Sequence, residues 1–456
     1  MSVTGIIAEY NPFHNGHRLQ LENVRAERRS ATAIVVCMSG AFTQRGTAAI
    51  LPKDVRARCA VENGADLVIE LPTVFAVRSA QYFAEGGVRL LAGLGIVDTL
   101  AFGTKCTDTE FLPRIAEKLN DTSTQDSLHK YLRQGLSYAG ALTRALDLDN
   151  KEETLLREPN TILAIEYLRA IASYASALRP LPLQRKGADY HDETLAGSIA
   201  SASAIRKELT ERGFDDAVCK AVPGTVAEAL RSMREIPDDE RLFRPLLAKL
   251  YTMTPETLAA CFGINEGLEN RILKAAKTTG SLREFCNTLC SRRYPMSRIG
   301  RTLLTLLLSF SPDEIAHFDE AGPLYIRVLA FNDRGRELLK DIRQKSSLPI
   351  VTRVRPFLRH SAEETDTPAQ RMLQYDTLAS DIWGLTLKEL PPAGEDFRRS
   401  PVQIPKKLSN SQIPIPITRA MTATGSATKK INPRIQMAIS ASHSLRASEF
   451  PPPKDL

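Results

Sequence analysis

The chain has 456 residues, of which 43% are hydrophobic, and it contains no apolar run of about 18 residues that could span a membrane. Its length supports two or three domains with hydrophobic cores. The N-terminus lacks the charged region, apolar stretch and small-residue cleavage site of a secretory signal peptide. We therefore expect neither a membrane protein nor a secreted one.

The cysteine content and the charge narrow the possible class of protein further. The seven cysteines are scattered and odd in number, which is typical of reduced thiols in the cytoplasm. Cys286 and Cys290 are four residues apart with no second pair nearby, so we interpret them as packing residues and predict no metal site. The net charge is +7, but residues 396–456 hold ten Lys and Arg against three Asp and Glu. Residues 1–395 are therefore neutral, and a polyanion site there must be a local patch.

Apolar runs alternate with helical patterns over the first 215 residues, which is the βαβ rhythm of a parallel sheet. The predicted strands are residues 3–8, 33–38, 66–70, 99–102 and 181–184. We therefore predict an α/β fold with a doubly wound parallel sheet, which binds ligands at the carboxyl ends of its strands. No Gly-x-Gly-x-x-Gly or Walker A sequence occurs, so neither a dinucleotide fold nor a P-loop NTPase is supported.

The segment GIIAEYNPFHNGH, residues 5–17, joins the first predicted strand to a helix. Two of the seven histidines in the chain, His14 and His17, flank Gly16 here. A helix that starts near Gly16 would offer backbone N–H groups and its positive dipole end to phosphates, and the imidazoles would stabilise phosphate charge. The alternatives are helix-cap residues or a partial metal site, which lacks a third ligand nearby. We favour a nucleoside triphosphate site.

Two further segments follow predicted strands. Residues 38–46 form a polar loop with two glycines and hydroxyls around Arg45, which would clamp phosphate or the second substrate. In residues 102–104, Gly103 would let the backbone approach an adenine or a ribose. The alternative for residues 38–46 is an ordinary loop between a strand and a helix, and Gly103 taken alone is a weak signal.

Two more segments carry polar residues toward the same edge of the sheet. Residues 158–161 begin a helix with proline in its first turn and present Asn160, which is equally a helix-start residue. Residues 183–187 place Arg185 and Lys186 just after a strand, which suits a triphosphate but also a solvated turn.

The segment SASAIR, residues 201–206, opens the last helix of this region. Hydroxyl groups at a helix N-terminus, including Ser203, with Arg206 one turn later predict a second anion site. Two phosphate-binding helix starts in one fold are together a more specific sign of a phosphate site than either one alone.

Helical patterns replace the strands over residues 216–390, apart from one possible strand at 325–330. Residues 291–301 place four arginines around a tyrosine, which suits RNA phosphates and unstacked bases but also occurs on solvated helices. Residues 391–456 are basic and rich in Pro, Ser, Thr and Ala, so we predict a disordered tail. The candidate RNA-binding residues are Arg45, Arg292, Arg293, Tyr294, Arg298 and Arg301.

Together these residues resemble the tRNA(Met) cytidine acetate ligase family of the HIGH-motif nucleotidylyltransferase superfamily, which has a Rossmann-like core. The resemblance covers about residues 1–390. It implies a nucleotidylyltransferase-like ATP-binding domain over 1–215 and a mainly helical RNA-binding domain over 216–390, with the tail at 391–456 outside it. The matching blocks, in family order, are GIIAEYNPFHNGH, MSGAFTQRG, AFGT, REPNTILAIEYL, LQRKGADYHD, SASAIR and YIRVLAFNDRGR.

The resemblance implies an AMP-forming ligase. ATP and acetate would form acetyl-adenylate and pyrophosphate, and the acetyl group would pass to N4 of the wobble cytidine of elongator tRNA(Met). Mg²⁺ that bridges the triphosphate is expected on general grounds. The implied catalytic residues are His14, His17 and Arg206. The implied ATP-binding residues are Ile7, Ala8, Glu9, Tyr10, Asn11, Pro12, Phe13, His14, Asn15, Gly16, His17, Arg18, Leu19, Gln20, Gly103, Asn160, Arg185, Lys186 and Ser203.

Two departures from the family pattern and two rival functions stay open. Lys105 stands where the family usually has an acidic residue, and Gln20 where many members carry a histidine. Glu9 or Asp66 would serve as a general base, and each is equally a structural carboxylate. The rivals are an adenylyltransferase for a small phosphorylated acceptor and an RNA-binding protein without turnover. The long helical region argues against the first, and two intact phosphate motifs argue against the second.

Overall fold

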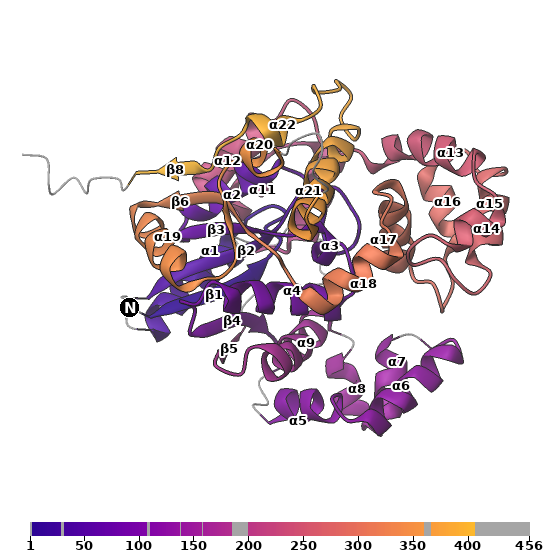
Figure 1. Ribbon diagram of the computed structural model, residues 1–456, viewed down its shortest axis with the longest axis horizontal. Helices are drawn as coiled ribbons and strands as arrows, with labels where there is room; N and C mark the ends of the chain where they lie inside the picture. The colour runs from indigo at the N-terminus through magenta and orange to yellow at the C-terminus, as the bar shows by residue number, and fades with distance from the viewer. Residues whose placement is uncertain are drawn as a thin grey trace, which may run out of the picture. The chain divides into compact units, whose positions relative to one another are not determined.

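An eight-stranded mixed sheet forms the centre of the described part of the chain in the computed structural model (Figure 1). The described residues are 2–28, 32–106, 110–136, 138–156, 158–184, 199–359 and 366–405, within a unit that runs from Met1 to Lys406. None of the helices in these ranges is long and apolar enough to cross a membrane. The strands are β1 Val3–Ala8, β2 Ala33–Ser39, β3 Leu67–Leu71, β4 Thr99–Thr104, β5 Arg179–Gln184, β6 Ile326–Asn332, β7 Ile350–Val351 and β8 Val402–Ile404.

The strand order confirms the predicted doubly wound sheet. It runs β5-β4-β1-β2-β3-β6-β7, and β8 also pairs with β6. Strands β1 to β5 are parallel, whereas β6 is antiparallel to β3. The chain leaves β1 toward β2 and β3 and later returns to place β4 on the other side of β1. The carboxyl ends of β1 and β4 therefore form the topological switch point, where such sheets bind ligands.

Helices cover both faces of the sheet, because side chains along each central strand alternate between two cores. Ile34, Val36 and Met38 of β2 pack on the side of α1, α2 and α10. Val35 and Cys37 pack on the side of α4, α9 and α19. These helices are α1 Asn15–Glu27, α2 Lys53–Glu62, α4 Ala80–Gly93, α9 Pro159–Tyr174, α10 Ala202–Arg212 and α19 Asp333–Lys345.

The other helices extend these layers or follow them along the chain. Those before α13 and after α17 are α3 Thr73–Ala76, α5 Phe111–Lys118, α6 Thr122–Arg133, α7 Tyr138–Ala145, α8 Asn150–Leu156, α11 Asp216–Ala221, α12 Gly224–Arg231, the 3₁₀ helix η1 Asp239–Leu242, α18 Pro312–Ala321, α20 Val354–Phe357, α21 Pro368–Gly384 and α22 Glu395–Arg398.

Five consecutive helices form a module with a hydrophobic core of its own, which includes Phe243, Phe285 and Ile299. The predicted helical run over this region is confirmed, and the possible strand at 325–330 is β6, which enters the central sheet. The division of the chain into domains near residues 215 and 390 stays a prediction. The predicted disordered tail was wrong for residues 391–405, which include α22 and β8 and pair with β6, and residues 406–456 lie outside the described residues. The helices of the module are α13 Phe243–Tyr251, α14 Pro255–Ala259, α15 Leu268–Ala276, α16 Leu282–Leu289 and α17 Met296–Leu307.

A buried cluster of charges fastens the C-terminal segment to the sheet. Lys53 Nζ lies 2.8 Å from both Glu70 Oε1 and Asp396 Oδ2. Arg327 Nε lies 3.2 Å from Glu70 Oε2, and its Nη2 lies 3.2 Å from Asp396 Oδ1. A Cβ on Gly40 would lie 2.3 Å from Glu70 Oε1, so the glycine of the loop after β2 is needed for the approach of this carboxylate.

Asp376 of α21 lies fully buried beside this cluster. Its Oδ1 accepts from Thr73 N–H at 2.7 Å, and its Oδ2 accepts from the Tyr325 hydroxyl. Burial, with the charge of Glu70 in addition, raises the pKa of Asp376 to about 7. An aspartate in an unfolded chain has a pKa of about 3.9, so its contribution to stability is full below about pH 4 and is lost as the pH rises to about 7.

We predict that Asp376→Asn removes this loss of folding stability with rising pH. Asparagine can accept from Thr73 and donate to Tyr325, so the fold should be retained. The free energy of unfolding of the variant minus that of the parent, measured by urea denaturation, should rise from about pH 4 to about pH 7.5. Asp341→Asn, at an exposed position of α19, is the control for loss of a carboxylate. A difference that does not vary with pH for Asp376→Asn would contradict the assignment.

Candidate active site

A cavity of about 270 Å³ opens at the topological switch point of the sheet. Its walls come from the ends of β1, β4 and β5, the starts of α1, α9 and α10, and the loop after β2. Most of the described residues that we predicted to bind a nucleotide lie together here. Those that line it are Ile7, Ala8, Glu9, Tyr10, Asn11, His14, Gly16, His17, Leu19, Gln20, Gly103, Asn160, Ser203 and Arg206.

Four residues of the first motif do not line the cavity. Phe13 is buried against the Tyr10 ring, with centroids 4.8 Å apart. Asn15 Nδ2 donates to the Lys220 carbonyl at 2.8 Å. Arg18 Nε lies 3.6 Å from Glu22 on the exposed side of α1. The fourth is Pro12, and all four support the turn or the helix rather than the cavity wall. Arg185 and Lys186 lie outside the described residues.

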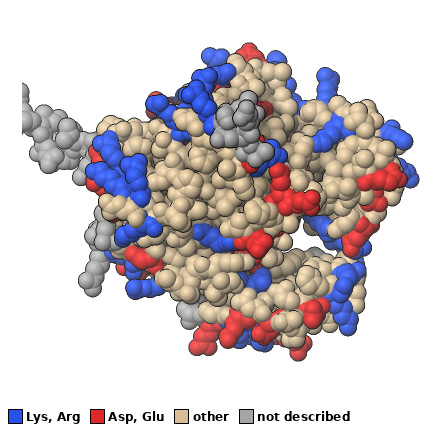
Figure 2. Space-filling view, in the orientation of Figure 1, with Lys and Arg blue, Asp and Glu red and all other residues tan. Residues whose placement is uncertain are grey.

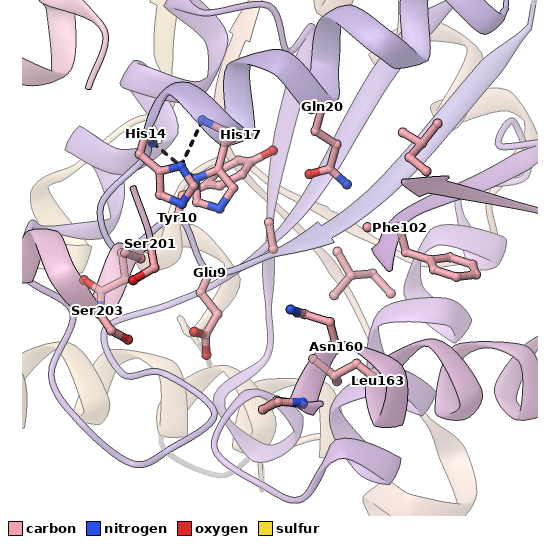
Figure 3. Close-up of a pocket in the computed structure, with 18 of the residues that line it drawn as sticks. Glu9, Tyr10, His14, His17, Gln20, Phe102, Asn160, Leu163, Ser201 and Ser203 are labelled. Atoms are coloured by element: carbon pink, nitrogen blue, oxygen red, sulfur yellow. Dashed lines mark hydrogen bonds between the residues drawn. The ribbon is translucent and has the colours of Figure 1, made fainter. Parts of the chain in front are cut away.

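The two histidines form a stacked pair at the start of α1, with centroids 3.6 Å apart (Figure 3). His14 caps the helix, since its Nδ1 accepts from Gly16 N–H at 3.1 Å. His17 Nδ1 accepts from His14 N–H at 3.2 Å. A neutral imidazole whose Nδ1 accepts carries its proton on Nε2. Both rings can therefore present an Nε2–H donor to an anion in the cavity.

The turn that leads into α1 accepts hydrogen bonds from two other segments, the loop after β2 and α10. Tyr10 has a left-handed backbone, with φ of 48°, and the Asn11–Pro12 peptide bond is cis. Asn11 Oδ1 accepts from Ile50 N–H at 2.7 Å, and the Asn11 carbonyl accepts from Arg206 Nη1 at 2.6 Å. Glu9 Oε1 accepts from Gln44 N–H at 2.6 Å. The turn is thus fixed by α10 and by the loop after β2.

A second helix begins at the same cavity. Ser201 caps α10, with its Oγ 3.1 Å from Ala204 N, and Ser203 Oγ accepts from Arg206 Nη2 at 3.2 Å. Burial lowers the pKa of Arg206 from its ordinary value, and the nearby Arg45 acts in the same direction. The N-terminal ends of α1 and α10 both face the cavity, so backbone N–H groups and two imidazoles converge there with a cation.

The opposite side of the cavity is apolar. Figure 3 shows Phe102 and Leu163 across the cavity from His14, His17, Ser201 and Ser203, with Asn160 beside Leu163. Tyr167 and Leu183 also line it. The Lys105 ammonium lies 3.6 Å from Glu158 Oε2 at this end, so the departure from the family pattern pairs with the cap residue of α9. The cavity suits a ligand with an anionic end and a flat apolar end.

Arg56 of α2 supports the site, and we did not identify it from the sequence. Its fully buried guanidinium donates to the carbonyls of Leu51 at 3.1 Å and Glu9 at 2.6 Å, and to those of Ser39 and Gly40. Burial lowers the pKa of Arg56 to about 10, so the group stays protonated at neutral pH. It joins the chain segments that follow β1 and β2. Its helix also contains Arg58, and nothing in the sequence distinguishes the two arginines.

Of the two carboxylates considered as a general base, Glu9 alone lines the cavity. Asp66 directly precedes β3, so it lies at the amino ends of the parallel strands, away from the cavity. Its Oδ2 accepts from Ile34 N–H at 2.8 Å and from Arg25 Nη2 at 3.1 Å. Asp66 is therefore a structural carboxylate. Glu9 is the only carboxylate among the described lining residues, and the described residues contain no group of three or more His, Cys, Asp or Glu placed to hold a metal.

In the arginine-tyrosine cluster after α16, the tyrosine that we predicted to bind RNA does not face solvent. Tyr294 is buried, and its hydroxyl donates to the Asn265 carbonyl at 3.2 Å. The Arg298 guanidinium covers its ring at 4.5 Å from the centroid. Arg292 is exposed, and Arg293 pairs with Glu266. The arginines can meet phosphates, but the tyrosine ring packs into the helical module.

The chain is similar to known proteins over most of its length. A family model described as HIGH Nucleotidyl Transferase matches residues 1–396. A tRNA(Met) cytidine acetate ligase of Halothermothrix orenii is 37% identical over 401 residues, which cover 84% of this chain and 95% of that protein. The protein of the same name from Acetivibrio thermocellus is 38% identical, over 88% of this chain and 99% of its own length.

Solved structures agree with these sequence matches. The apo crystal structure of Thermotoga maritima TmcAL has a TM-score of 0.81 at 31% identity, and the match covers 89% of this chain and 100% of that chain. Another structure of that protein, bound with alpha-thio ATP, has a TM-score of 0.80. At this identity and coverage, the chain belongs to the HIGH nucleotidyl transferase family and, within it, to the tRNA(Met) cytidine acetate ligases.

Proposed function

We propose that this chain activates acetate with ATP and transfers the acetyl group to N4 of the wobble cytidine of elongator tRNA(Met). The observation that carries the proposal is the meeting of two helix N-termini and a stacked histidine pair at one cavity. The names of the relatives support the ligase activity and the tRNA. The ATP analogue bound to the T. maritima protein supports the nucleotide.

The two ends of the cavity support one orientation of ATP. The adenine fits the apolar end, between Phe102 and Leu163, where the Asn160 amide can reach its edge. The phosphates then lie between His14, His17 and the start of α10. Imidazole Nε2–H groups and backbone N–H groups are the donors that phosphate oxygens require. The same orientation brings the α-phosphate close to the middle of the cavity, beside the end of β1.

In the activation step, a carboxylate oxygen of acetate attacks the α-phosphorus in line. The bond from the α-phosphorus to the bridging oxygen breaks, and pyrophosphate leaves with the electron pair. Negative charge grows on the leaving group, and His14, His17 and Arg206, which line the cavity, would stabilise it. The protein supplies positions and charges here, and none of its own atoms forms a covalent bond to substrate.

Magnesium fits this site only as an ion held mostly by the nucleotide. Mg²⁺ in phosphate sites keeps several waters and takes one or two carboxylates. Glu9 is the described lining carboxylate that would contribute, and one of its oxygens already accepts from Gln44 N–H. The ion would neutralise charge on the triphosphate.

In the transfer step, the cytidine amine attacks the acyl carbon of acetyl-adenylate, and AMP leaves as the acyl–oxygen bond breaks. The amine loses a proton, for which Glu9, the only carboxylate among the described lining residues, is the candidate acceptor. The base must leave the anticodon loop to reach this point, which a single-stranded loop permits. Figure 2 shows mixed charges on the module of α13–α17, with Lys and Arg along its outer edge. RNA contact would therefore use local arginines: Arg292, Arg293, Arg298 and Arg301 from this module, with Arg45 from the loop after β2.

The cytoplasm is the proposed location of this reaction. None of the seven cysteines, all of which lie among the described residues, forms a disulfide, and four of them are buried. Buried, unpaired thiols are typical of a reducing compartment.

The function is tested by following the label from radiolabelled acetate. The protein is incubated with ATP, labelled acetate and bulk tRNA, and the RNA is then digested to nucleosides. We expect the label in N4-acetylcytidine and AMP formed in equal amount. AMP formation without labelled RNA, or adenylyl transfer to a phosphorylated metabolite, would favour the small-acceptor alternative. ATP and tRNA binding without turnover would favour the RNA-binding alternative.

We predict that His14→Asn and His17→Asn each lower acetate-dependent ATP–pyrophosphate exchange by about 10²–10³-fold, because each removes a donor to the leaving group. Arg18→Ala is the matched control on the same helix, since Arg18 pairs with Glu22 outside the cavity. The exchange rate of the control should stay close to that of the parent. An equal loss in Arg18→Ala would contradict the placement of the phosphates.

A further inference from the structure

The loop after β2 forms a tight hairpin whose tip, residues 44–46, is shared by two parts of the molecule. Thr43 N–H donates to the Thr47 carbonyl at 2.9 Å, and Gly46 N–H donates to the Thr43 carbonyl at 2.9 Å. Gly46 has φ of +78°, a left-handed conformation that glycine adopts without steric cost. The tip is thus a defined turn.

One side of the tip belongs to the active site. Gln44 and Arg45 line the cavity, and Gln44 N–H donates to Glu9 Oε1 at 2.6 Å. A second hydrogen bond holds the hairpin, in which Ala48 N–H donates to Asp239 Oδ1 at 3.0 Å. The position of the tip is therefore fixed relative to the end of β1.

The other side of the tip packs backbone to backbone against α17. A Cβ on Gly46 would lie 2.7 Å from the carbonyl carbon of Gly300, and a Cβ on Gly300 would lie 2.9 Å from the Arg45 carbonyl oxygen. Real Cβ atoms do not approach other atoms so closely, so both positions need glycine. This contact brings the backbone of the tip next to that of Arg301, close enough for the charge of Arg45 to act on the Arg301 guanidinium.

The Arg301 guanidinium is a charged group that is largely withdrawn from water. The structure records no hydrogen bond or ion pair for its side chain among the described residues, and the side chain is only partly exposed. Burial, with the charges of Arg298 and Arg45 in addition, lowers the pKa of Arg301 to about 10. Charged groups withdrawn from water are normally paired, and a phosphate is the partner that two adjacent guanidinium groups fit.

We propose that Arg45 and Arg301 together form a site for one phosphate of the tRNA backbone, at the rim of the cavity. Arg45 lines the cavity but Arg301 does not, so the shared phosphate belongs to a molecule that approaches from outside rather than to the nucleotide. This proposal rests on the proposed function, because the phosphate would be the one next to the base that enters the cavity. The glycine contact fixes the distance between that phosphate and the adenylate.

The test compares Arg301→Ala with the parent in two separate assays. Binding of unfractionated tRNA is measured by fluorescence anisotropy as a function of salt. We expect affinity to fall about tenfold, and the slope of log affinity against log salt to decrease by about 1. Acetate-dependent ATP–pyrophosphate exchange, which needs no tRNA, should be unchanged. Arg301→Lys should recover part of the affinity, since it restores the charge without the fork.

Arg283→Ala is the matched control, because Arg283 is an exposed arginine of α16 in the same module. It should leave tRNA affinity close to that of the parent. Thermal unfolding of Arg301→Ala should match the parent, because no partner is lost, so weaker binding cannot come from misfolding.

Three results would overturn the site. An equal loss of exchange in Arg301→Ala would assign the phosphate to ATP, and no change in either assay would show that no phosphate binds. Failure of the parent to bind tRNA at all would also exclude it. A parent that binds tRNA but forms no acetylcytidine would refute the proposed function only, since the binding assay would still decide the site.

Discussion

The buried guanidinium of Arg56 is the interaction on which the active site depends. It donates to carbonyl groups of the segments that follow β1 and β2, including those of Glu9 and Gly40. Without this guanidinium, these carbonyls would be buried without a hydrogen-bond donor, and each unpaired group would lower the stability of the fold. A single cation that satisfies them holds the turn before α1 and the hairpin after β2 in one arrangement. The histidines and the hairpin tip then keep their positions without a ligand.

This rigidity matters because the proposed reaction needs little covalent chemistry from the protein. The displacement at the α-phosphorus depends on alignment of the acetate oxygen, the phosphorus and the leaving group. Donors that already have the right positions stabilise the developing charge more than donors that must first reorganise. The His14–His17 pair shows how this is built, since each Nδ1 is occupied by a backbone N–H and the ring orientation is fixed.

The sequence predicted the features that depend on local pattern. The predicted strands agree with β1 to β5 within a few residues, and both predicted phosphate-binding helix starts lie at the cavity. Features that depend on distant contacts could not be predicted. Lys53 pairs with Asp396 across more than 340 residues, and Tyr294 turns into its own module because Asn265 and Arg298 bind it. Arg56 looks like any helical arginine until its neighbours are known.

The central claim is that acetate attacks the α-phosphorus of ATP in this cavity. The most direct measurement uses acetate labelled with ¹⁸O in both oxygens, with ATP, tRNA and the protein, followed by mass spectrometry of the products. If acetyl-adenylate forms and is then consumed by the cytidine amine, one ¹⁸O stays on phosphorus and AMP carries it, while pyrophosphate is unlabelled. Label in inorganic phosphate or pyrophosphate, or unlabelled AMP from a turning-over enzyme, would contradict the account.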